Sequence, residues 1–474
     1  MHIGRMRRIV ITALCLTQTL CKILPPPVNI RALKPKGFIV SIPDDPGITK
    51  YEFECKVNDK ISFTKPGNIR EQLTKHEDGR WSYRNGDVEL KLGDILYYRY
   101  KYVKYKEGVH SNTKEFLVQD LIDIQYLEHT PRVGDCVKSL TVLRETEACS
   151  GDIIFEDNFD TLREGVWRFE QYIPSEPDYP FVSYQHHNNA HVIFVEDGYL
   201  KIEPKLLQNI SPYSGTSILS GTLDLTNGCT STPGNCEKRA SRANILPPIV
   251  SGRITATSLA FTYGTVEIRA KLPHGDWLYP DILLQSIYDW PGTFNKHSGV
   301  VRIAGARGNL DLKEGDTEYG NKVLYGGVIL NAGCRNDLLN QTVGTEPWGS
   351  DFHVYSLRWA PESITLSVDG REWAKYEPGA DGLKSLYTKQ CQLKASLSKT
   401  SKIAPFNEYF SLTLGVSAGG LLEFPDDVVS GVEPKPWRNS QSKSLYNFYQ
   451  ELIQWWATWT QPALTVDYVR VYAL

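Results

Sequence analysis

The chain has 474 residues, of which 41% are hydrophobic and 11% aromatic, and this composition excludes an intrinsically disordered protein. The 52 basic and 55 acidic residues nearly cancel, so the chain as a whole has no net positive field of the kind that attracts nucleic acid or anionic membranes. The length allows one large domain plus a small one, or two to three average domains.

The N-terminus is basic and is followed by a short, uncharged, largely apolar run. This pattern predicts a secretory signal peptide over residues 1–21, with cleavage before Lys22 or directly after Thr19. The run is too short to span a membrane, and no other segment has about 18 consecutive apolar residues. We therefore expect a secreted, extracellular protein without a membrane span. The glycosylation sequons at Asn209 and Asn340 are compatible with this location.

Seven cysteines remain after the leader, so at least one thiol is free, buried or paired to another chain. Cys229 and Cys236 bracket a turn-rich loop and are predicted to form a disulfide. Cys136 and Cys149 are a second local candidate, and each loop would contribute roughly 2.5–3 kcal/mol. The ten histidines are scattered and no cysteine spacing is typical of zinc, so we expect no metal and no cofactor.

Strand patterns dominate residues 22–125. Apolar and polar residues alternate on both sides of the turn at 44–47, and two hairpin signals flank residues 80–83. This region is predicted to form a small antiparallel, immunoglobulin-like β-sandwich. The periodicity weakens over residues 126–150. This segment is interpreted as a connector that a disulfide between its cysteines holds in place.

The region 151–474 also consists mostly of predicted strands. Apolar residues alternate in five segments, 266–272, 353–359, 364–368, 410–414 and 466–472. One helical pattern, with apolar residues at 3.6-residue spacing, covers 445–459. Mostly strand over such a length favours one large sandwich or jelly roll, and hence an all-β protein.

Residues 152–474 resemble glycoside hydrolase family 16, the laminarinase-type β-glucanases. The likeness is carried by the order and spacing of the segments 155–160, 261–273, 352–359 and 466–472. The resemblance implies a concanavalin-like jelly roll with a catalytic strand of the pattern Glu-x-Asp-x-x-Glu. A retaining glycosidase needs two carboxyl groups roughly 5–5.5 Å apart. Strand alternation and a bulge bring the residues of this pattern onto one face.

The matching stretch in this chain is 298–308, where Val300, Arg302 and Gly305 replace the three acids. None of them can donate a proton or attack as a carboxyl group does. The resemblance therefore predicts a glucanase-like fold without catalytic activity. The alternative is that the strand is misaligned. The acids that would then be candidates lie in a polar, glycine-flanked segment typical of a solvated loop: Glu314, Asp316 and Glu318.

The whole architecture resembles the insect β-1,3-glucan recognition proteins, also called Gram-negative bacteria-binding proteins. The N-terminal likeness lies in the segments 37–49, 78–83 and 92–98. The resemblance implies binding of β-1,3-glucan, and of peptidoglycan or lipopolysaccharide as further candidates, coupled to extracellular immune serine proteases of Toll or prophenoloxidase cascades. A weakly active secreted β-1,3-glucanase and a structural or inhibitory glycoprotein remain the competing interpretations.

The resemblance also implies which residues contact sugar, because carboxylate and guanidinium groups form charge-assisted hydrogen bonds to hydroxyls. The candidates in the first region are Asp44, Asp45, Arg80, Trp81, Tyr83 and Arg84. In the second region, a vestigial cleft would be lined by Trp277, Tyr279, Trp290 and Arg302. The alternatives are that the two aspartates only form a turn and that the tryptophans belong to the cores.

Overall fold

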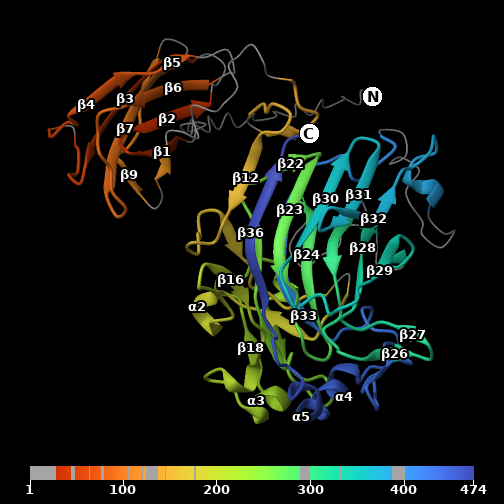
Figure 1. The fold of residues 1–474 in the computed structure, drawn as a ribbon. Coiled ribbons are helices and arrows are strands. Elements are labelled where there is room, and N and C mark those ends of the chain that lie inside the picture. Colours follow the sequence, from red (N-terminus) through yellow and green to blue (C-terminus); the bar gives the residue numbers. More distant parts are fainter. Residues whose placement is uncertain are drawn as a thin grey trace, which may run out of the picture. The chain divides into compact units, whose positions relative to one another are not determined.

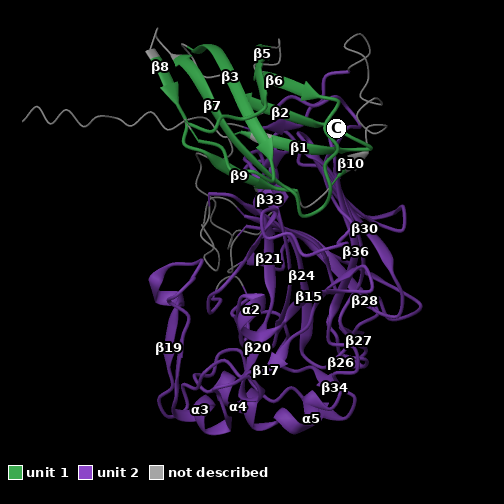
Figure 2. Ribbon diagram, turned by 90° about the vertical axis from the view of Figure 1, so that its left-hand side faces the viewer, with its two compact units in different colours: residues 1–134 green, residues 135–474 purple. Residues whose placement is uncertain are grey.

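The computed structural model describes residues 28–43, 48–62, 64–75, 80–104, 107–118, 121–123, 137–144, 146–175, 178–288, 299–330, 334–386 and 401–474. The predicted signal peptide lies outside these ranges. The chain divides into two compact units, residues 1–134 and 135–474 (Figure 2). Within the described parts, no helix is long and apolar enough to cross a membrane.

The first unit contains two five-stranded sheets among its described residues, which confirms the small β-sandwich. One has the order β10-β1-β2-β6-β5. Its strands are β1 (Asn29–Lys34), β2 (Phe38–Pro43), β5 (Thr74–Lys75), β6 (Arg80–Asn85) and β10 (Ile122–Asp123). The other has the order β4-β3-β7-β8, with β9 also paired to β7. Its strands are β3 (Ile48–Val57), β4 (Ile69–Gln72), β7 (Ile95–Lys104), β8 (Glu107–His110) and β9 (Lys114–Leu117).

Strand alternation explains the core of this unit. On β3, Tyr51, Phe53 and Cys55 are at most 1% exposed and face the core, whereas the residues between them face outward. Cys55 is the free cysteine among the described residues, as the odd cysteine count predicts. Burial, with a smaller contribution from the neighbouring Glu54, raises the pKa of the Cys55 thiol to about 12.

The second unit is built on two large sheets, which confirms the jelly roll (Figure 1). A nine-stranded sheet comprises β11 (Val142–Leu143), β13 (Trp167–Phe169), β21 (Arg253–Ala256), β22 (Phe261–Thr262), β24 (Leu278–Ser286), β25 (Val300–Gly305), β28 (Val323–Ile329), β29 (Leu339–Val343) and β33 (Phe410–Ala418). An eight-stranded sheet comprises β12 (Ile153–Asp157), β15 (Ile193–Glu196), β16 (Tyr199–Ile202), β23 (Gly264–Lys271), β30 (His353–Ala360), β31 (Ser363–Val368), β32 (Arg371–Tyr376) and β36 (Leu464–Tyr472). Apolar residues of both sheets share one core cluster.

Smaller elements complete the described part of this unit. The short strands are β14 (Val182–Tyr184), β17 (Lys205–Leu206), β18 (Thr222–Asp224), β19 (Glu237–Arg239), β20 (Ile249–Ser251), β26 (Leu312–Glu314), β27 (Thr317–Glu318), β34 (Val429–Ser430) and β35 (Glu433–Pro434). The α-helices are α2 (His187–Ala190), α3 (Gly215–Ser220), α4 (Ser444–Gln450) and α5 (Leu452–Trp456). Short 3₁₀ helices cover Leu207–Asn209, Pro233–Asn235 and Leu383–Leu386. The helical pattern at 445–459 is therefore confirmed, but as two short helices.

The described part of the expected connector belongs to the second unit. Strand β11 pairs with β22, and the amide of Leu140 donates to the carbonyl of Leu474 at 3.1 Å. The predicted Cys229–Cys236 disulfide is present, with 5.8 Å between the Cα atoms. Cys149 and Cys334 are disulfide-bonded as well. Since Cys136 lies outside the described residues, its pairing with Cys149 stays a prediction.

Candidate functional site

Strand β25 is the strand that the family 16 resemblance marks as catalytic, and all six of its residues are buried. It lies between β24 and β28. Its pairing with β28 is irregular between Arg302 and Gly305, which is where the sequence pattern calls for a bulge. Val300 and Arg302 therefore share one face of the sheet by alternation, and the irregularity changes the direction of Gly305.

The surroundings of Val300 and Gly305 do not suit carboxylates. Val300 packs in an apolar cluster with Leu283 and Ile329. A Cβ atom at Gly305 would lie 2.8 Å from a ring carbon of Tyr325, closer than packed atoms approach each other. A carboxylate at position 305 would therefore displace Tyr325, and one at position 300 would be buried among apolar side chains.

Arg302 is 1% exposed and makes ordered polar contacts with several elements. Its Nη2 donates to Oδ2 of Asp178 at 2.8 Å, and its Nη1 donates to the carbonyl of Pro280 at 3.1 Å. The guanidinium carbon lies 5.9 Å from the ring centre of Tyr279 and 5.6 Å from that of Tyr325. At the position that the resemblance assigns to the middle acid, the chain thus carries a buried cation that is paired through both of its Nη atoms.

Arg302 belongs to a larger buried charge cluster, in which four guanidinium groups meet four carboxylates. Its members are Glu170, Asp178, Arg253, Asp281, Arg302, Arg307, Arg335 and Glu423. Arg253 holds Asp281 at 2.8 Å and Glu170 at 3.0 Å, and Arg307 holds Glu423 at 3.1 Å. Arg335 forms short contacts with both Asp178 and Glu423. The charges balance within the cluster.

The cluster also determines the ionisation of Asp178. Burial opposes the charged form of this carboxyl, but the ion pairs with Arg335 and Arg302 outweigh it and lower the pKa. A carboxylate held in this way is neither a proton donor nor an accessible nucleophile.

The expectation that Trp277, Tyr279 and Arg302 line an open cleft is wrong. Trp277 is 2% exposed and packs edge-on against Phe424 and Trp437, with ring centres 5.2 and 5.0 Å apart. Tyr279 and Arg302 are buried as well. Trp290 lies outside the described residues. The alternative acids at 314–318 lie on the hairpin formed by β26 and β27, where Glu314 and Asp316 are exposed.

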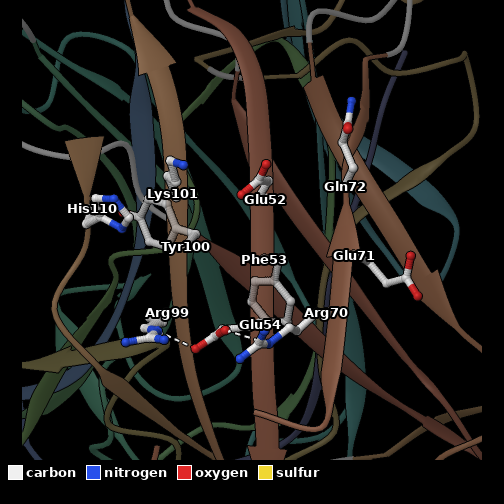
Figure 3. Close-up of a pocket in the computed structure, with 10 residues that line it drawn as sticks. All are labelled: Glu52, Phe53, Glu54, Arg70, Glu71, Gln72, Arg99, Tyr100, Lys101 and His110. Carbon is white, nitrogen blue, oxygen red and sulfur yellow. Dashed lines mark hydrogen bonds and ion pairs between the residues drawn. The ribbon is translucent and has the colours of Figure 1, made fainter. Parts of the chain in front are cut away.

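The first unit carries a surface groove of about 380 Å³ on the outer face of the sheet formed by β4, β3, β7 and β8 (Figure 3). It is lined by Glu52, Phe53, Glu54, Arg70, Glu71, Gln72, Arg99, Tyr100, Lys101 and His110. Phe53 and Tyr100 belong to the buried core, whereas the other residues are polar. Eight of the ten lining residues therefore carry polar or charged side chains, and their aliphatic stems and the two aromatic residues supply apolar surface between them.

Strand register arranges the polar side chains of the groove in two rows. One row crosses the four strands through Gln72, Glu52, Lys101 and His110. A hydrogen bond from Lys50, 2.6 Å from Glu52, is the main reason that the pKa of Glu52 is lowered. This carboxylate is therefore ionised at neutral pH and accepts hydrogen bonds.

The second row consists of Arg70, Glu54 and Arg99. Glu54 lies 3.0 Å from Nε of Arg70 on one side and makes a short contact with Arg99 on the other (Figure 3). Fixed donors and acceptors in two parallel rows suit a hydroxyl-rich ligand, since hydrogen bonds to charged groups are strong and directional. Sequence reasoning missed this groove, although the alternation of charged residues along 50–56 was its signal.

The predicted sugar contacts on β6 lie on the other sheet of this unit. Asp44, Asp45 and the side chain of Arg80 lie outside the described residues. The prediction of Trp81 as an exposed stacking platform is wrong: the side chain is 6% exposed and lies in the core, 5.5 Å from the ring of Tyr51. Alternation also turns Tyr83 toward the core, where its ring lies 6.2 Å from that of Phe38. Arg84 is exposed.

Comparisons with known proteins match both units. The family model CBM39, described as a carbohydrate binding domain (family 32), matches residues 24–138. The catalytic domain of an endo-1,3-β-glucanase (laminarinase) from Thermotoga petrophila is similar in structure, at 18% identity and a TM-score of 0.41 over 68% of this chain and 97% of that one.

Relatives match over nearly the whole chain. A β-1,3-glucan-binding protein of Hyphantria cunea is 46% identical, covering 95% of both chains. β-1,3-Glucan-binding protein 1 of Manduca sexta is 35% identical over 95% of this chain and 96% of the relative. Gram-negative bacteria-binding protein 1 of Drosophila melanogaster is 32% identical over 92% and 93%. The chain therefore belongs to the family of insect β-1,3-glucan-binding and Gram-negative bacteria-binding proteins.

Proposed function

We propose that this protein recognises β-1,3-glucan without hydrolysing it. The observation that carries the proposal is the absence of carboxyl groups on β25. The relatives of this chain are named for binding glucan and bacteria. This strand has Val300, Arg302 and Gly305 where a glucanase of the resembled family needs acids, and the buried acids around it are paired with arginines.

The chemistry of glycoside cleavage supports this proposal. A retaining enzyme needs an ionised nucleophile and a second carboxyl that holds a proton, both in contact with the substrate. In the charge cluster, Asp178 and Glu423 are 6% and 0% exposed and are each held by arginine. The alternative of a weakly active glucanase requires one of these carboxyl groups to leave its guanidinium partner and reach the substrate. That step removes one carboxylate from a buried network of ion pairs, at a cost of about 3–5 kcal/mol.

The first unit is the proposed glucan-binding part, because the carbohydrate-binding family model covers it and the polar groove lies on it. Glu52 supplies an ionised acceptor, and Lys101 directly across from it supplies a donor. Peptidoglycan and lipopolysaccharide are also rich in hydroxyl groups and are further candidate ligands. The signal-peptide pattern supports secretion, and the proposed partners downstream are extracellular serine proteases of innate immune cascades.

The test is laminarin affinity of the full chain, with a matched pair of variants on the two sheets. The double variant Glu52→Ala/Lys101→Ala removes two charged contacts from the groove. Since a hydrogen bond to a charged group contributes about 1.5–3 kcal/mol, we expect laminarin binding to weaken roughly tenfold to a hundredfold or more. The control Arg84→Ala changes an exposed charge on the opposite sheet and is expected to keep full affinity.

The outcomes separate the components of the proposal. Loss of binding in Arg84→Ala with none in the double variant would place the site on the β6 sheet, as the resemblance implied. A wild-type chain that binds neither laminarin nor curdlan would refute glucan recognition. Release of reducing sugar above a buffer blank would refute the non-catalytic assignment and favour the glucanase alternative.

A further inference from the structure

A histidine cluster lies in the second unit, and none of its residues belongs to the buried charge cluster or to the groove. Glu164, His186 and His187 each offer one metal-ligating atom, and these atoms lie within 4.8 Å of one another. His186 caps the N-terminus of α2, and His187 is its first residue. Glu164 lies in the turn before β13. Among the described residues, this is the one group of three or more such side chains that is close enough to share an ion.

The distance between the facing atoms matches two ligands of one ion better than a direct ion pair. Nε2 of His187 lies 3.3 Å from Oε1 of Glu164. Charge-assisted hydrogen bonds between nitrogen and oxygen are shorter, about 2.7–2.9 Å. Two donors that are each about 2.0–2.2 Å from a tetrahedral zinc ion are about 3.3–3.5 Å apart.

Packing holds the two imidazole rings in place. Their centres lie 4.4 Å apart, and Phe169 packs against both, at 5.0 Å from His186 and 4.5 Å from His187. Phe169 is itself 5% exposed, so the rings rest on a rigid core residue. The side chain of His187 is 18% exposed and that of Glu164 is 63% exposed. Glu164 can therefore adjust its position to an ion, and the cluster is open to solvent on the side of this carboxylate.

Ligation requires few existing hydrogen bonds of the two rings to be broken. Nδ1 of His187 is buried without a hydrogen-bond partner, so ligation through Nε2 breaks none at this nitrogen. Nδ1 of His186 accepts a long hydrogen bond of 3.3 Å from the amide of Asn188, which costs little to give up.

We propose that Glu164, His186 and His187 form a site for one divalent transition-metal ion, zinc in particular, with water completing the coordination. Two imidazoles and one carboxylate suit zinc, whereas calcium and magnesium require oxygen ligands. A bound ion would join the turn before β13 to α2. This proposal does not depend on glucan recognition, since none of its residues belongs to the first unit.

The test uses the full-length chain without a polyhistidine tag, stripped of metal by a chelator. Zinc binding is measured by isothermal titration, and the absorption spectrum of the Co²⁺-loaded protein reports the ligand geometry. We expect one zinc ion per chain, a tetrahedral Co²⁺ spectrum, and a melting temperature that rises with zinc concentration. His187→Ala and Glu164→Gln should each weaken zinc binding at least about tenfold.

His191→Ala is the matched control. This histidine lies directly after α2, but its ring stacks on Phe194 at 4.9 Å and it is not part of the cluster. It should bind zinc like the wild type. Glu164→Gln changes an exposed side chain and should keep the fold. If His187→Ala is unstable, the zinc affinity of Glu164→Gln therefore tests the proposal. Absence of stoichiometric zinc, or equal loss in His191→Ala, would overturn the proposal.

Discussion

Replacing Arg302 with Met is expected to destabilise the second unit measurably. Removing one partner of a buried ion pair costs about 3–5 kcal/mol, because the other charge is left without compensation. Asp178 keeps Arg335 as a partner, so we expect the lower end of this range, about 3 kcal/mol. For a unit spanning residues 135–474, the entropy of unfolding is about 0.7 kcal/mol/K, so the melting temperature should fall by about 4 °C. Differential scanning calorimetry of the full chain at neutral pH measures this change.

The matched control is Arg269→Met. Arg269 pairs with Asp467 on the eight-stranded sheet, but its side chain is 37% exposed. Exposed ion pairs contribute about 0–1 kcal/mol, so the melting temperature should change by about 1 °C or less. If both variants lower the melting temperature equally, or if Arg302→Met raises it, the reasoning that the buried cluster stabilises this face of the sheet is refuted. Neither variant is expected to gain activity on laminarin.

Two further predictions concern acid stability and the position of Trp81. The folded-state pKa of Asp178 is lowered, so its stabilising contribution is complete above the unfolded pKa of about 3.9 and is lost as the pH falls through the folded value. Calorimetry should show the second unit losing stability as the pH falls below about 4, and losing less in Arg302→Met; an identical pH profile in that variant would contradict this. Because Trp81 is a core residue, Trp81→Ala should lower the free energy of unfolding of the first unit by about 3–5 kcal/mol in chemical denaturation. A stable variant that has lost laminarin binding would return the ring to the ligand site.

The local features of this chain could be read from the sequence. Alternation of apolar and polar residues identified the strands of both units, since successive side chains of a strand point to opposite faces. The order of four strand motifs identified the larger fold, and the absence of acids at Val300, Arg302 and Gly305 is a property of the sequence itself. The short loop between Cys229 and Cys236 allowed that disulfide to be predicted.

Only the tertiary structure decided which face of each strand is buried by a second layer. Alternation shows that a strand has two faces but not which one another layer buries. The sequence therefore left open whether Trp81, Trp277 and Tyr279 face a ligand or a core, and the structure places them in cores. The polar groove depends on the register of four strands, which no single strand encodes.

Long-range assembly explains the remaining differences. The charge cluster joins residues as distant as Glu170 and Glu423, and the metal-site candidate joins Glu164, in the turn before β13, to two histidines at the start of α2. Such residues come together because strands distant in sequence pair side by side in the sheets. Charged residues and histidines that are scattered in the sequence can form ion pairs or a metal site only after folding has brought them within contact distance.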